Sequence, residues 1–436
     1  MAEKTGLLAG FAKIDITPDF VTGLGGYSNA ESRLTTGVAE PIYTTCIALT
    51  DGEETILVYT FDNCACHHAV AEWIRERVTE ATGIAGEKIF CSATHSHNCP
   101  SFWAYPTVEQ YKELFLKACV EAAQKALEDR APATTMAAKK QFPNMNFVRH
   151  VELANGVTAG YDWPSHKSPI LGWGGHPDDM MVLVKFAREE KKDILLVNWQ
   201  GHPDCSRDIG FTLISPSFVG PLRDTVAAGS GMEVAYFTGA DGNMIIDSIM
   251  VPYRHNMKWR RYGVHIGTLV LDTLNELVEV EGDGIATSRA MVEVDVDHSW
   301  DHMVPQANEV YDLWKATDKP TGDALGKKYN FSSVYQARAI RDRANMDKTM
   351  TLEVNAFRVG GVGFTTGTYE MFSESGIAVK KGSPYAFTMV LTGNSSYIPS
   401  DRAFNHRCYE ADTGFYARGT AEKLVDKYLE MLNEIK

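Results

Sequence analysis

The residues best suited to chemistry are two histidines, His95 and His97, which follow the apolar segment 87–92. Side chains at positions i and i+2 of a strand share one side, so a strand that ends here would point both imidazoles into one cleft. A third histidine, His202, follows the apolar run 193–199 in a Gly-His-Pro turn. Ligands usually bind at the carboxyl edge of an α/β sheet, so these two strand ends indicate a metal site, although a His-x-His pair alone could be structural.

The hydrophobic pattern between these motifs predicts the elements that position them. Strand-like runs alternate with helical periodicity, which favours an α/β fold with central mixed β-sheets covered by helices. The segment 138–180 is rich in Gly, Pro, Asn and aromatic residues, so we expect ordered loops near the site there. Helices are expected at 68–82, 107–128, 256–281 and 413–435, and strands at 43–50, 55–60, 87–92, 181–187, 193–199, 233–238, 290–297, 350–358, 361–366 and 386–392.

Composition narrows the class of protein. The chain has 436 residues and a formal net charge of −14, which argues against nucleic acid and against docking of a basic patch to a membrane. No run approaches the length of a membrane-spanning helix, so no stable membrane insertion is expected. The amino terminus lacks a secretory pattern and the eight cysteines form no Cys-x-x-Cys pair, which predicts reduced thiols in a cytoplasmic protein. We expect a single domain over 1–436, with a possible seam near 282–290.

Six motifs, in the same order along the chain, resemble those of the neutral/alkaline non-lysosomal ceramidase family. They are an opening strand at 10–18, Thr-His-Ser-His at 94–97, Gly-His-Pro at 201–203 with 214–220, a glycine-containing turn at 237–243, Tyr-Glu-Met-Phe-Ser-Glu-Ser-Gly at 369–376 and Ser-Tyr-Ile-Pro-Ser at 396–400. The resemblance extends over nearly the whole chain. It implies the fold of the catalytic domain of that family.

The resemblance also implies one catalytic zinc ion per chain, held by His95, His202, Glu370 and Tyr397. Two neutral imidazoles, a carboxylate and a phenolic oxygen are donors that suit Zn²⁺ and leave room for a water molecule. A bound cation lowers the pKa of that water from about 15.7 towards 7, so hydroxide forms at neutral pH. The phenol of Tyr397 could also leave the metal and donate to a developing oxyanion.

The same comparison gives roles to two further residues. His97 is expected to transfer protons beside the metal, and Arg149, in a segment similar to Asn-Arg-Arg of the family, to contact the oxyanion or the substrate. Each residue also has a structural interpretation. His97 could satisfy a main-chain carbonyl, Glu370 could stabilise a helix N-terminus, Tyr397 could anchor a turn, and Arg149 could form a surface salt bridge.

The chain departs from the family in ways that bear on the substrate. The segment 239–241 lacks the serine that ceramidases use in amide cleavage, and aromatic residues at 102–105 replace a glycine-rich loop. Only 36 residues follow Ser400, so we expect no carboxyl-terminal immunoglobulin-like domain. These departures predict a compact polar pocket for a small-molecule substrate of sugar or amino-acid size. Its walls are expected to include Trp103, Tyr105, Arg149 and Trp173.

The sequence therefore predicts a zinc-dependent hydrolase that cleaves an amide or ester bond of a small polar substrate. Two alternatives remain open. The same metal could polarise a sugar-like substrate for lyase or isomerase chemistry with His97 as the base, or the protein could be a non-catalytic relative whose metal is structural or absent. An open coordination position that faces a pocket would favour the catalytic readings.

Overall fold

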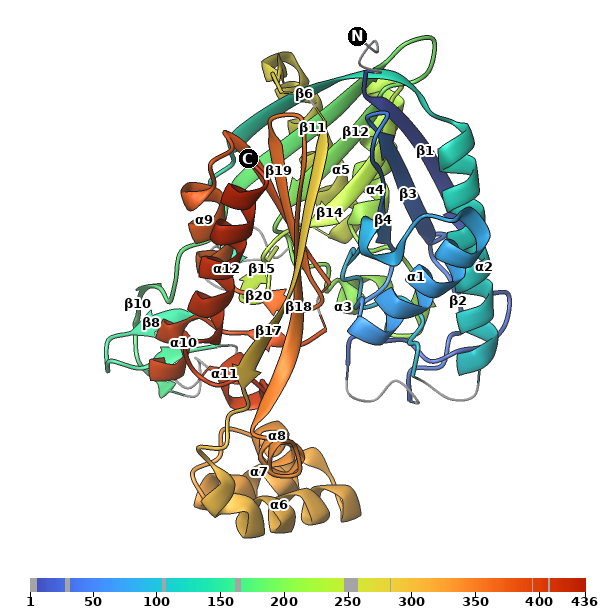
Figure 1. Cartoon of the computed structure of the whole chain (residues 1–436). Coiled ribbons are helices and arrows are strands. Elements are labelled where there is room, and N and C mark those ends of the chain that lie inside the picture. The colour runs from blue at the N-terminus through green and yellow to red at the C-terminus, as the bar shows by residue number, and fades with distance from the viewer. Residues whose placement is uncertain are drawn as a thin grey trace.

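A large mixed β-sheet forms one half of the molecule (Figure 1). The computed structural model describes residues 6–27, 32–103, 107–160, 166–246, 258–282, 284–393, 395–406 and 408–436. Within them, the strands of this sheet run in the order β14 (Glu233–Thr238), β12 (Ile194–Trp199), β11 (Met180–Arg188), β6 (Ala131–Gln141), β1 (Leu8–Asp15), β3 (Tyr43–Thr50), β4 (Thr55–Phe61) and β5 (Ile89–Ala93), with β16 (Val278–Glu279) paired to β6. The pairs β4–β5 and β12–β14 are parallel and the others are antiparallel. Parallel neighbours need a crossover, and helices supply both.

A second, smaller sheet packs on the first. Its strands run in the order β17 (Ile285–Asp295), β18 (Thr349–Val359), β19 (Val362–Gly367) and β21 (Phe387–Thr392). Buried apolar side chains from both sheets form one core between them, in which the ring of Phe357 stacks between Phe90 and Phe364 at centroid distances of 4.4 and 4.6 Å. Each phenylalanine buried in this way contributes about 1.5–3 kcal/mol to stability.

Helices cover the outer faces, which gives a helix–sheet–sheet–helix arrangement. The helices α1 (His68–Thr82) and α2 (Val108–Glu128) lie on one part of the large sheet, and α4 (Val219–Ser230) and α5 (Trp259–Thr273) on another. Helices α9 (Ser373–Gly382) and α12 (Thr420–Glu434) cover the small sheet. Apolar residues of α2 recur every three or four positions, so a single face of this helix is buried.

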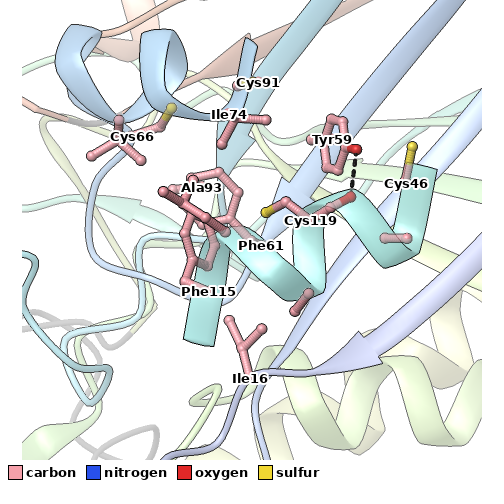
Figure 2. Close-up of a cluster of buried hydrophobic side chains, with 14 of the residues drawn as sticks. Ile16, Cys46, Tyr59, Phe61, Cys66, Ile74, Cys91, Ala93, Phe115 and Cys119 are labelled. Carbon is pink, nitrogen blue, oxygen red and sulfur yellow. Dashed lines mark hydrogen bonds between the residues drawn. The ribbon is translucent and has the colours of Figure 1, made fainter. Parts of the chain in front are cut away.

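Figure 2 shows the core beneath α1 and α2, which is unusually rich in cysteine. Cys66, Cys91 and Cys119 are buried there, and the hydroxyl of Tyr59 donates to the main-chain oxygen of Cys119 at 2.8 Å. Burial raises the pKa of the Cys46 thiol, which therefore stays protonated. All eight cysteines of the chain lie in described segments and are free, and the seven buried ones, all except Cys64, act as small apolar residues.

An all-helical insertion separates β17 from β18 and was not expected from the sequence. It comprises α6 (Val304–Ala316), α7 (Lys319–Lys328) and α8 (Val334–Ala344), which lie together beyond the ends of the two strands (Figure 1). Their shared core contains Val310, Phe331 and Ile340 together with small residues. Because α7 and α8 are short and bury glycine and alanine, they carry little hydrophobic periodicity.

The expected strands are confirmed, most within one or two residues, whereas two expected helices are shorter than the pattern indicated. The helix predicted over 256–281 ends at Thr273, because the chain then enters β16. The helix predicted over 413–435 begins at Thr420, after Gly419 adopts a positive φ of 92°.

The segment 138–180, expected to be ordered loops, also contains strands. It holds the last residues of β6, the first residue of β11, and four short strands: β7 (Phe147–Val148), β8 (Val151–Leu153), β9 (Thr158–Ala159) and β10 (Ile170–Trp173). In the described part of the chain, no helix has both the length and the apolar character needed to cross a membrane.

Candidate metal centre

Two groups of elements deliver the candidate ligands. His95, His202 and Asp241 follow β5, β12 and β14, which lie at the two ends of the large sheet's strand order. Glu370 and Tyr397 come from two short strands, β20 (Glu370–Met371) and β22 (Tyr397–Ile398), which pair in parallel so that Glu370 lies directly opposite Tyr397. Residues from distant parts of the chain therefore meet where strands end, as the sequence predicted.

His95 and His97 converge, but not because a strand holds them. The strand β5 ends at Ala93, and His95 has a φ of 67°, a left-handed conformation that costs about 1–2 kcal/mol in a residue with a Cβ. The two Nε2 atoms lie 3.3 Å apart. The two imidazoles were expected to converge because alternate residues of a strand share one face. They do converge, but a strained turn after the strand brings them together. Gly26 packs so closely on His97 that an added Cβ would lie 2.5 Å from its Cγ.

His95 and His202 are buried, neutral imidazoles that each lie beside a main-chain oxygen. The Nδ1 atom of His95 donates to the main-chain oxygen of Cys64 at 2.5 Å, and Nδ1 of His202 lies 3.3 Å from the main-chain oxygen of Asp241. Burial lowers the pKa of both imidazoles well below the ordinary value, so they are neutral. Because Nδ1 of His95 donates to a main-chain oxygen, the lone pair of its Nε2, which faces Glu370, is left for a cation. In His202 it is Nδ1 that faces Glu370.

Two buried carboxylates lack the donors that such groups require. Oε1 of Glu370 lies 3.6 Å from Nε2 of His95 and 3.8 Å from Nδ1 of His202. Neither this oxygen nor either side-chain oxygen of Asp241 has a hydrogen-bond partner among the described residues. Burial raises the pKa of Glu370 and of Asp241 well above the ordinary value, and the charge of Asp241 adds to the effect on Glu370. A cation at this point would satisfy these oxygens.

These residues fit a zinc ion. Zn–N and Zn–O bonds of about 2.0–2.2 Å in a tetrahedral site place neighbouring donor atoms about 3.3–3.5 Å apart. One donor atom each from His95, His202 and Glu370 lies within 4.8 Å of the others, and Tyr397 stands opposite Glu370. Cys64, His95 and His97 satisfy the same distance criterion, so His97 also lies close enough to serve as a ligand.

Asp204 and Tyr27, which the sequence analysis did not select, hold His97 on its other side. Nδ1 of His97 lies 3.8 Å from Oδ2 of Asp204, and the hydroxyl of Tyr27 donates to Oδ1 of the same carboxylate at 2.6 Å. Burial alone would raise the pKa of Asp204, yet His97 and Tyr27 hold it below the ordinary value. Burial lowers the pKa of His97 below its ordinary value, and a charged Asp204 opposes this shift and orients the imidazole. The sequence signal was the position of Asp204, two residues after His202.

Arg149 lies beside Tyr397 and is fixed by Glu410, a second residue that the sequence analysis missed. The guanidinium carbon lies 5.4 Å from the centre of the Tyr397 ring. Glu410 is 1% exposed and accepts from the guanidinium of Arg149 through one oxygen, while its other oxygen lies 2.9 Å from Nε2 of His150. Arg149 also donates to the main-chain oxygen of Gly242 at 2.7 Å. The salt-bridged alternative for Arg149 is therefore present, but the salt bridge is buried and does not lie at the surface.

Glu410→Gln should destabilise the protein by about 3 kcal/mol, because it leaves the buried guanidinium of Arg149 without its counter-charge. Urea denaturation at pH 7 measures this loss. Glu152→Gln is the matched control, since Glu152 pairs with Arg402 at the surface, and it should cost less than about 1 kcal/mol. Equal losses in the two variants would contradict the assignment.

The pH dependence of this loss has a definite sign. The pKa of Glu410 lies well below its ordinary value. Burial alone would raise this pKa, but the opposite effect of the charges of Arg149 and His150 is larger. The stability that the ionised carboxylate contributes is therefore fully present above the unfolded pKa of about 4.3. It is lost as the pH falls from there through the lower folded-state pKa. The difference between wild type and Glu410→Gln should be constant from pH 6 to 8 and should narrow below about pH 4.

A pocket of about 380 Å³ opens beside the candidate ligands. His95, His97, Glu370 and Tyr397 line it, as does Trp103, whose side chain is 54% exposed. Two residues expected in its walls, Arg149 and Trp173, are not among the described lining residues. Trp173 packs instead on Phe147 at a centroid distance of 5.3 Å. Tyr105 lies outside the described residues. The described walls also include Tyr335, Arg338 and Asp342 from the helical insertion.

Comparison with known proteins places the fold in one class. The structure is similar to neutral ceramidase from Pseudomonas aeruginosa, with a TM-score of 0.73 and 16% sequence identity, over 99% of this chain and 74% of that one. It is also similar to a ceramidase complexed with C2, with a TM-score of 0.70 and 16% identity, over 98% and 75% of the two chains. No family model matches the sequence, and no curated protein matches it. The chain therefore has the neutral ceramidase fold, as its motifs predicted.

Proposed function

We propose that the protein is a zinc-dependent hydrolase that cleaves an amide or ester bond of a small polar molecule. The observation that carries the proposal is the pair of neutral, buried imidazoles of His95 and His202 next to an oxygen of Glu370 that has no hydrogen-bond partner among the described residues, with His95 and Glu370 lining a pocket. Hydrolase activity also agrees with the names of the two proteins that share the fold. When bound, zinc would polarise the carbonyl group of the substrate and activate water.

The side chains around this point have separable roles in the proposal. His97 takes up and returns a proton at Nε2, because its Nδ1 faces the carboxylate of Asp204. Tyr397 lies opposite Glu370 in the pairing of β20 and β22 and lines the same pocket, and in this proposal its hydroxyl donates to the oxygen that gains charge as the bond breaks. Burial keeps the pKa of Tyr397 well above its ordinary value, so the phenol retains its proton for that purpose. Arg149, held by Glu410, fixes the position of the Tyr397 ring.

The walls of the pocket favour a small polar substrate over a two-chain lipid. Charged and hydrogen-bonding side chains such as Asn63, Ser101, Arg338 and Asp342 line it alongside aromatic rings. Its volume of about 380 Å³ lies near the lower end of the range for small-molecule sites. Two acyl chains need a long apolar channel, whereas these walls suit hydrogen bonds and ring stacking.

The zinc-loaded protein should hydrolyse short amides or esters at least tenfold faster than long-chain ceramide presented in detergent micelles. Turnover should vanish with a chelator and return with zinc. The neutral ceramidase from Pseudomonas aeruginosa, run in the same micelles, controls for the presentation of the lipid. Comparable turnover of ceramide and of the best small substrate would refute the proposal of a small polar substrate and would favour a lipid amidase.

A further inference from the structure

The helical insertion forms one wall of the pocket. Tyr335, Arg338, Ala339 and Asp342 of α8 all line it, and their spacing of i, i+3, i+4 and i+7 places them on one face of this helix. The same pocket contains His95 and Glu370. A substrate bound at the metal centre would therefore also meet α8.

This wall is held in a fixed position relative to the metal centre. Helix α8 packs on α11 (Tyr409–Thr413), where Gln336 donates to Asp412 at 3.3 Å and the buried Arg343 donates to the main-chain oxygen of Gly414 at 2.8 Å. The ring of Tyr409 lies 6.3 Å from that of Tyr335 and 6.1 Å from that of Tyr397. A row of three tyrosines thus connects the insertion to the candidate ligands.

Arg338 is the one permanently cationic side chain among the described residues that line the pocket. Its Nε lies 3.4 Å from Oδ2 of Asp342, and both side chains are 46% exposed, so this pair is weak. The structure gives the two terminal nitrogens of the guanidinium no partner within the described part of the chain. These nitrogens form a planar fork that can bind a carboxylate through two parallel hydrogen bonds.

We propose that the substrate carries a carboxylate group and that Arg338 binds it, so that the helical insertion selects the substrate. Binding of the carboxylate does not depend on the proposed function; only the hydrolysis that follows binding rests on it. A carboxylate is favoured over a phosphate because the acidic side chain of Asp342 lines the same pocket next to Arg338, and its charge opposes a dianion more than a monoanion. The overall charge of −14 acts in the same direction.

Isothermal titration of the zinc-loaded, full-length protein with three ligands that cannot be hydrolysed tests the proposal. They are 4-oxopentanoate, which has a carboxylate, 5-hydroxypentan-2-one, which is neutral, and 3-oxobutylphosphonate, which is a dianion near pH 8. We expect the carboxylate to bind most tightly. Arg338→Gln should weaken its binding about fivefold or more and remove its advantage over the neutral ligand. Asp342→Asn should tighten it, because a competing acid is removed.

Lys327→Gln is the matched control, since Lys327 is an exposed cation of the same insertion and does not line the pocket. It should leave the affinity for 4-oxopentanoate unchanged. Unchanged affinity in Arg338→Gln, an equal loss in Lys327→Gln, or tighter binding of the phosphonate would each overturn the proposal. Failure of the metal assignment is distinguishable, because the effect of Arg338→Gln should persist in a His202→Ala background.

Discussion

His202→Ala should reduce zinc binding from one ion per chain to none at micromolar zinc. His202 is neutral, 4% exposed and directed at the same point as His95 and Glu370. Without it, the remaining donors of the site would need an additional water molecule, which makes a weaker site. Elemental analysis of the dialysed protein gives the ratio of zinc to chain directly, and hydrolysis should disappear along with the metal.

His302→Ala provides the control for this experiment, because His302 is an exposed histidine just before α6 and is not among the described residues that line the pocket. It should retain one zinc ion. Circular dichroism and the Tm establish that His202→Ala is folded. A folded His202→Ala variant that still holds one zinc ion per chain would remove His202 from the ligand set.

His97→Ala should keep the zinc ion and lose a factor on the order of 10²–10⁴ in kcat. The reason is that His97 faces the carboxylate of Asp204 through Nδ1 and the metal centre through Nε2, which is the arrangement of a proton-transferring residue. The measurement is kcat on the best small substrate, with zinc content determined on the same sample and His302→Ala as the reference.

If His97 is instead a zinc ligand, His97→Ala should lose the zinc ion. Nε2 of His97 lies 3.3 Å from Nε2 of His95, a separation that two ligands of one ion would also show. Loss of zinc in His97→Ala would therefore make His97 a ligand and require a new donor set. Retention of both zinc and kcat would leave His97 with a structural role alone.

Local sequence patterns identified the strand ends and the candidate ligands, because each motif combines an apolar run with the polar residues that follow it. Glu370 and Tyr397 are opposite each other as the motifs implied. The residues that orient the site were missed because they act on residues far away in the sequence. Glu410 acts on Arg149, which is 261 positions away, and no local pattern reports a contact of that kind.

Asp241 and α8 illustrate two other limits of the sequence. Asp241 lies in a turn that the motif comparison included, but only the structure shows that its carboxylate is buried without a donor. Helix α8 is short, and its buried face includes the polar Gln336 and Arg343, so its hydrophobic pattern did not distinguish it from loop. Its contribution to the pocket follows from the packing of a whole insertion, which no motif of the sequence described.

The division of the donors between distant segments also bears on how the protein matures. A nascent chain presents His95 and His202 well before Glu370 and Tyr397 are synthesised, and neither pair alone makes the donor set proposed for zinc. Contacts between residues so far apart in sequence form late and slowly in folding. Zinc uptake would then be one of the last steps of maturation, and a misfolded or partly synthesised chain would not compete for the ion with the finished protein.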